Sequence, residues 1–138
     1  MSQRETRLSD IEILKLDIFQ KFSGKLVALQ SGNEIPWKIE RIFFISTRNS
    51  EDRGDHAHIE AHQAFVCIAG SGRLICKDGS ESINIEMNAI DTAVLLPPGI
   101  WVNISLSENS SLAVITDLPY DEADYIRRWD NFLKHKGL

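Results

Sequence analysis

The sequence contains little cysteine and no long apolar run. Its two cysteines, Cys67 and Cys76, lie in separate apolar stretches and form no Cys-x-x-Cys pair, so neither a disulfide framework nor a thiolate metal site is supported. No run approaches the ~20 apolar residues that a membrane-spanning helix needs. The first ten residues are charged and lack the apolar core of a secretory signal. We therefore expect a cytoplasmic protein without membrane association.

Excess positive charge is also missing. The formal net charge is −5, and the lysines and arginines are scattered in ones and twos. Such a chain offers no basic face that would neutralise a phosphate backbone, so nucleic acid is not an expected partner. What the sequence does have is 138 residues that are 43% hydrophobic and 25% charged. That composition is typical of one globular domain with a real core.

Short β-type runs separated by turn residues fill most of the chain. Asp78-Gly79 between two such runs is typical of a tight hairpin turn. Many short strands at close spacing predict an all-β sandwich or barrel. The expected strands are residues 25–30, 37–46, 54–58, 63–69, 72–77, 81–86, 92–96, 101–106 and 112–116.

The two ends of the chain differ from this pattern. Residues 1–20 carry spaced apolar side chains, and the alternation of Ile11 and Ile13 and then of Leu14 and Leu16 fits a strand at least as well as a helix. We interpret the segment as an extended arm, which would suit pairing with the sheet edge of another subunit. Near the other end, acidic residues 121–124 precede an apolar stripe at helical spacing, which predicts a helix over residues 121–136. The predicted organisation is a single domain with an arm (1–20), a barrel (21–118) and a C-terminal helical segment (119–138).

A histidine cluster is the main candidate for chemistry. In a strand, residues two apart share a face, so His56 and His58 should project side by side, with His62 beyond a turn. Two imidazoles followed by Pro98-Gly99 resemble the motifs of a cupin. A metal-binding cupin would have a carboxylate and a further imidazole where this chain has Gln63 and Val102, so we expect no metal.

Without a metal, the two imidazoles are expected to work as acid and base. Imidazole takes and gives protons near neutrality, and such catalysis contributes ~10²–10⁴-fold. Arg41 and Arg53 would suit a sugar-nucleotide pyrophosphate. Trp101 is interpreted as a stacking residue for a sugar or base, with core packing as the alternative. The other interpretation is that the histidines have no catalytic role and only form hydrogen bonds at a polar end of the barrel.

Four strings identify a family resemblance. They are residues 35–45, Arg53-Gly54-Asp55-His56-Ala57-His58 with Gln63, Pro98-Gly99-Ile100-Trp101, and Tyr120-Asp121-Glu122-Ala123-Asp124-Tyr125-Ile126-Arg127. Together they resemble the WxcM-like (FdtA/QdtA) family of dTDP-sugar 3,4-ketoisomerases.

The resemblance implies a metal-free cupin homodimer without a cofactor. It would convert a dTDP-4-keto-6-deoxyhexose into the 3-keto isomer in deoxyaminosugar biosynthesis for a bacterial surface polysaccharide. His56 and His58 match the family's two histidines. The substrate-binding candidates are Arg41, Arg53, Gln63 and Trp101.

Two other functions stay open. Family members commonly have tyrosine in the stretch that is Phe43-Phe44 here, so a sugar-nucleotide-binding module without turnover is one alternative. A metal-dependent cupin is the other.

Overall fold

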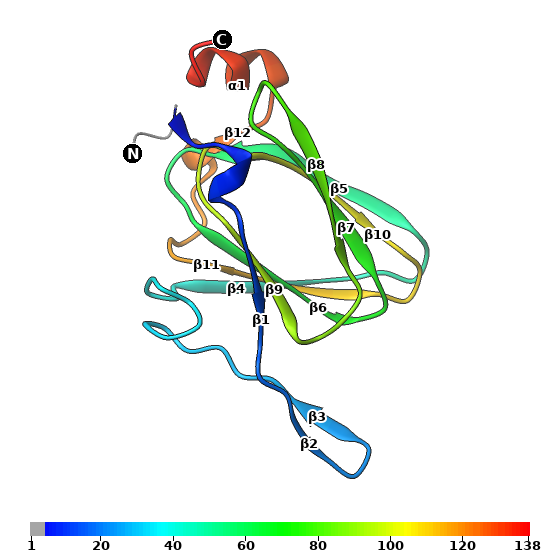
Figure 1. The fold of residues 1–138 in the computed structure, drawn as a ribbon. Helices are drawn as coiled ribbons and strands as arrows, with labels where there is room; N and C mark the ends of the chain where they lie inside the picture. The colour runs from blue at the N-terminus through cyan, green and yellow to red at the C-terminus, as the bar shows by residue number, and fades with distance from the viewer. Residues whose placement is uncertain (1–4) are drawn as a thin grey trace.

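The protein folds as two facing antiparallel sheets with a short helix at one end (Figure 1). A computed structural model describes residues 5–138, so the first four residues of the predicted arm lie outside it. The first sheet has the order β1-β9-β6-β11-β4, and the second has the order β12-β5-β10-β7-β8. This arrangement confirms the predicted all-β, cupin-type double-sheet barrel with a C-terminal α-helix.

The strands of the first sheet are β1 (Glu12–Lys15), β4 (Arg41–Ser46), β6 (Gln63–Ala69), β9 (Thr92–Leu96) and β11 (Ser111–Thr116). Those of the second sheet are β5 (Glu51–His58), β7 (Gly72–Lys77), β8 (Ser82–Met87), β10 (Trp101–Leu106) and β12 (Tyr125–Ile126). A separate hairpin pairs β2 (Phe19–Lys21) with β3 (Gly24–Leu26).

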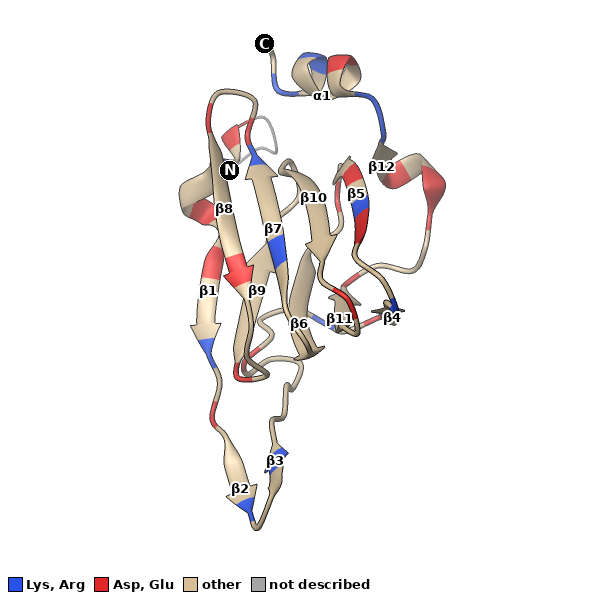
Figure 2. Ribbon diagram, turned by 90° about the vertical axis from the view of Figure 1, so that its right-hand side faces the viewer, with Lys and Arg blue, Asp and Glu red and all other residues tan. Residues whose placement is uncertain are grey.

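Alternation along the strands builds the core between the sheets. On β6 the side chains of Phe65 and Cys67 face the second sheet, where they join Leu74, Val102 and Ile104 in one buried cluster. Successive residues of a strand point to opposite faces, so the first sheet also has an outer apolar face. Part of that face is covered by the segment between β3 and β4. Charged residues are frequent on β5, which begins Glu51-Asp52-Arg53 (Figure 2).

The C-terminal segment differs from the predicted continuous helix. It contains a 3-10 turn η3 (Glu122–Asp124), then β12, and only then α1 (Trp129–His135). Tyr125 pairs with His58 and Ile126 pairs with Ala57, so pairing with β5 overrides the local helical spacing. No helix among residues 5–138 has the length and hydropathy that a bilayer crossing requires.

The hairpin β2–β3 projects away from the barrel at the end opposite α1 (Figure 1). Phe19, Phe22 and Leu26 are exposed by 64%, 90% and 58%. The arm strand β1 pairs with β9 of its own chain. The expected strand character of the arm is therefore confirmed over Glu12–Lys15, and the hairpin is the part that stands free.

Candidate active site

His56 and His58 lie side by side at one end of β5. Their ring centroids are 5.2 Å apart and the rings are nearly perpendicular, at 86°. The strand spacing predicts this shared face. Nδ1 of His56 and Nε2 of His58 are buried and have no hydrogen-bond partner among the described residues.

A bulge in β5 places the first histidine. His56 pairs with Val102 and Gly54 pairs with Asn103, so Asp55 is the extra residue between them. Gly54 has a φ of +93°, and a Cβ there would lie 2.8 Å from the Val102 carbonyl oxygen. Only glycine fits such a position without strain. The glycine of the Arg-Gly-Asp-His string is thus required by the backbone.

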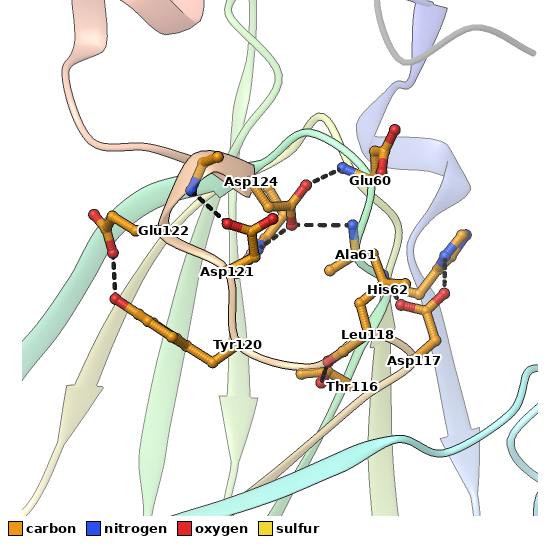
Figure 3. A network of polar contacts seen from close by, with 12 residues as sticks. Glu60, Ala61, His62, Thr116, Asp117, Leu118, Tyr120, Asp121, Glu122 and Asp124 are labelled. Carbon is orange, nitrogen blue, oxygen red and sulfur yellow. Dashed lines mark hydrogen bonds and ion pairs between the residues drawn. The ribbon is translucent and has the colours of Figure 1, made fainter.

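Asp124 orients the second histidine. Nδ1 of His58 lies 2.9 Å from Oδ2 of Asp124. A carboxylate only accepts, so Nδ1 carries the proton and Nε2 keeps a lone pair. Asp124 also accepts from the backbone N–H groups of Glu60, at 2.6 Å, and Ala61, at 3.3 Å (Figure 3). The carboxylate is therefore held from three sides and fixes the ring.

Both imidazoles are held in the neutral form. Burial, together with a smaller effect of the neighbouring His58, lowers the pKa of His56 from 6.5 to about 4. Burial also lowers the pKa of His58, although its hydrogen bond to Asp124 acts in the opposite direction. At neutral pH the site thus presents two uncharged imidazoles, the form in which a general base works.

A pocket of about 210 Å³ opens beside His56, between the edges of β4 and β5. We call it the central pocket. Its apolar wall includes Phe43, Phe65 and Ile104. The polar residues that line it are Arg41, Arg53, His56, Gln63, Tyr125 and Arg127. His58 is 5% exposed and lies behind Tyr125 rather than on the pocket surface.

Three arginines give this pocket a positive lining. Arg41 and Arg53 were predicted, and Arg127 joins them from the segment after β12. Arg127 donates from Nη2 to Oε2 of Glu122 at 3.0 Å. This bond lowers the pKa of Glu122 to about 2. The lining suits an anionic group such as a diphosphate.

Trp101 lies outside the central pocket. It is 7% exposed, and its ring centroid is 5.4 Å from that of Trp129 and 5.6 Å from that of Phe132. The side chain therefore packs against α1 and belongs to a buried cluster with Ala57 and Ile126. This placement matches the core-packing alternative for Trp101, and a stacking role does not follow from the geometry.

His62 also lies apart from the histidine pair. Its Nδ1 is 2.9 Å from Oδ2 of Asp117 (Figure 3), and its ring lies 6.2 Å from that of Trp37. Among residues 5–138, no three His, Cys, Asp or Glu side chains converge as metal ligands would. The donor set around His56 and His58 thus does not fit the metal-dependent alternative.

Three further residues belong to the site although no local pattern predicts it: Asp124, Tyr125 and Arg127. All three belong to the Tyr-Asp-Glu-Ala-Asp-Tyr-Ile-Arg string, which was noted only for its resemblance. The helical spacing of the apolar residues around that string concealed its pairing with β5.

The double-sheet barrel and the imidazole pair beside an arginine-lined pocket define a cupin-type enzyme. A family model described as FdtA, WxcM-like, C-terminal, matches residues 9–137, and the chain belongs to this family.

Relatives found by sequence and by structure are both named as 3,4-ketoisomerases or 3,4-oxoisomerases. TDP-4-oxo-6-deoxy-alpha-D-glucose-3,4-oxoisomerase of Aneurinibacillus thermoaerophilus is 36% identical over 114 residues, which are 81% of this chain and 82% of the relative. A 3,4-ketoisomerase from Helicobacter canadensis superimposes with a TM-score of 0.89 at 32% identity, over 93% of this chain and 98% of its own.

A histidine-to-asparagine variant of the 3,4-ketoisomerase QdtA from Thermoanaerobacterium thermosaccharolyticum was solved in complex with TDP-4-keto-6-deoxyglucose. It has a TM-score of 0.89 at 26% identity, over 94% of this chain and 96% of its own. The chain is accordingly an isomerase of the 3,4-ketoisomerase class.

Proposed function

We propose that the protein converts a dTDP-4-keto-6-deoxyhexose into its 3-keto isomer, with His56 and His58 as the proton carriers. The observation that carries this proposal is the pair of neutral imidazoles, 5.2 Å apart, beside an arginine-lined pocket. The relative from Aneurinibacillus thermoaerophilus is named for TDP-4-oxo-6-deoxyglucose, and the QdtA variant was solved with TDP-4-keto-6-deoxyglucose bound. Both support the choice of substrate.

The isomerisation requires proton transfer at two adjacent carbons. A base removes the hydrogen from C3, the electron pair forms a C3–C4 double bond, and the C4 carbonyl becomes the oxygen of an enediol(ate). Reprotonation at C4 then leaves the carbonyl at C3. Neutral imidazole suits the first step and imidazolium suits the last, so neighbouring histidines supply both forms in turn.

The pocket lining is proposed to hold the nucleotide end of the substrate. Arg41, Arg53 and Arg127 would bind the diphosphate, because guanidinium groups form paired hydrogen bonds with phosphate oxygens. Gln63 is buried at the pocket wall and would bind a sugar hydroxyl or carbonyl. Phe43, in the stretch where family members commonly have tyrosine, lines the same wall.

The homodimer is a further part of the proposal. A two-stranded hairpin is marginally stable in water, yet β2–β3 exposes Phe19, Phe22 and Leu26. Ile42 and Phe44, on the outer side of β4, are exposed by 52% and 67%. A second copy would cover these surfaces. The cytoplasmic location and the place in deoxyaminosugar biosynthesis for surface polysaccharide stay predictions.

Incubation with dTDP-4-keto-6-deoxyglucose in D₂O tests the reaction. We expect a 3-keto product that carries deuterium at C4, detected by NMR and mass spectrometry. His56→Asn and His58→Asn should each lower kcat by at least ~10²-fold if both imidazoles transfer protons. Lys38→Ala, a change at an exposed residue outside the pocket lining, is the control.

Two outcomes would contradict the proposal. Folded protein that binds dTDP in calorimetry but gives no product and no exchange would favour the binding module. Full activity in both histidine variants would remove the acid/base assignment.

A further inference from the structure

Among the residues that line the central pocket, two have side chains of a type that can transfer protons in acid/base catalysis: His56 and Tyr125. The remaining polar side chains of the lining are arginines, which stay charged, and Gln63, which does not titrate. Tyr125 is also the one hydroxyl-bearing residue of that lining.

Strand pairing fixes Tyr125 against the histidines. It lies opposite His58 in the β12–β5 register, and directly opposed residues on neighbouring strands contact each other. Its ring centroid is 4.3 Å from that of His58 and 5.0 Å from that of His56. The Tyr125 side chain thus contacts both imidazoles and borders the pocket as well.

Arg127 gives this tyrosine a cationic neighbour. Its guanidinium lies 4.3 Å from the Tyr125 ring centroid and is held by Glu122. A fixed positive charge beside the ring would stabilise negative charge that develops on the phenol oxygen during proton transfer.

The proposed reaction needs a proton carrier at oxygen as well as at carbon. When the C3 hydrogen leaves, O4 must gain a proton to form a neutral enediol. When C4 is protonated, O3 must lose one to form the new carbonyl. The histidine pair accounts for the carbon transfers. Phe43 lines the pocket in the stretch where family members commonly have tyrosine, and its ring has no proton to exchange with these oxygens.

We propose that Tyr125 is a further catalytic residue, whose hydroxyl donates a proton to O4 of the sugar and then takes the proton of O3. This assignment rests on the proposed ketoisomerase function. In the first half, imidazole gains the C3 hydrogen while the phenol gives its proton to O4 and becomes phenolate. In the second half, imidazolium returns a proton to C4 while the phenolate takes the O3 proton. Phenol and imidazole are both regenerated, so the protons balance.

Tyr125→Phe tests the assignment because it removes the hydroxyl and keeps the ring that packs on both imidazoles. We expect kcat to fall by about 10²-fold or more. The KM, the dTDP affinity from calorimetry and the thermal midpoint should stay close to those of the unchanged protein.

Tyr120→Phe is the matched control. Tyr120 is 57% exposed, and its ring lies 5.7 Å from that of Tyr125 but outside the pocket lining. We expect it to retain turnover. If the parent protein is active and Tyr125→Phe turns over at the same rate, the Tyr125 assignment is overturned and the proposed function is unaffected. An inactive parent protein would contradict the proposed function and this assignment together. Equal losses in Tyr125→Phe and Tyr120→Phe would also overturn the assignment.

Discussion

At the scale of single residues, the two histidines of the site have different surroundings. His56 borders the pocket, whereas His58 is buried behind Tyr125 and held by Asp124. Desolvation is the largest influence on both rings. A buried neutral imidazole costs stability when the medium becomes acidic, because the folded state resists the protonation that the unfolded chain accepts.

The lowered pKa of His56 predicts that the stability of the protein depends on pH. The pKa of His56 is about 4 in the folded protein and 6.5 in the unfolded reference. Its contribution is fully present above pH ~6.5 and is lost as the pH falls from there towards 4. Between pH 7 and pH 5 the free energy of unfolding should fall by about 2 kcal/mol on this account. Urea titrations at several pH values measure it.

His56→Asn is the control for that titration. The variant should lose less stability over the same pH interval, because one of the two buried imidazoles is gone. Parallel curves for the two proteins would contradict the assigned burial effect.

Sequence reasoning at this scale found the residues whose spacing is local. His56 and His58 are two apart on one strand, so their neighbourhood follows from strand geometry alone. Asp124 and Tyr125 are more than sixty positions away from them along the chain, and no local rule brings them together. Trp101 shows that a correctly predicted strand does not give a side chain's surroundings. Its strand could be predicted, but the helix that covers the side chain could not be placed.

At the scale of elements, the bulge in β5 decides where His56 points. Gly54 and Asp55 both have positive φ, at +93° and +56°. Asn103 donates from Nδ2 to Oδ1 of Asp55 at 3.2 Å and ties the bulge to β10. Strand alternation predicted most barrel strands well, β6, β7, β9 and β10 to the residue. It could not predict the bulge, which depends on the register of two distant strands.

Gly54→Ala is expected to destabilise the protein by about 1–3 kcal/mol and to lower kcat, because its Cβ would meet a backbone carbonyl in a strained conformation. Chemical denaturation and the isomerase assay measure the two effects. Gly32→Ala is the matched control, since Gly32 has a φ of +81° but nothing within 4 Å of the added Cβ. A loss of stability no larger than that of Gly32→Ala would show that the close approach is unimportant.

At the scale of the whole molecule, the free hairpin distinguishes one end of the barrel. Phe22 occupies its turn with a φ of +58° and 90% exposure. A bulky side chain is disfavoured in that region of φ. Local stability of the turn therefore does not explain this residue, and contact with a second copy of the chain would.

Phe22→Asn tests the contact. Asparagine tolerates positive φ, so the turn should persist while the apolar contact is lost. Light scattering coupled to size exclusion should show a dimer for the unchanged protein and a shift to monomer for the variant. Ile83→Ser, a change at an exposed apolar residue of β8, should leave the dimer intact. A monomeric parent protein would refute this interface.

The late position of β12 in the chain affects how the enzyme matures. Ribosomes make proteins from the N-terminus onward, and folding proceeds as segments emerge. Eleven strands precede β12 among the described residues, so the other strands of both sheets leave the ribosome before Asp124, Tyr125 and Arg127 do. A nascent chain would thus possess most of its scaffold before it possesses a working centre.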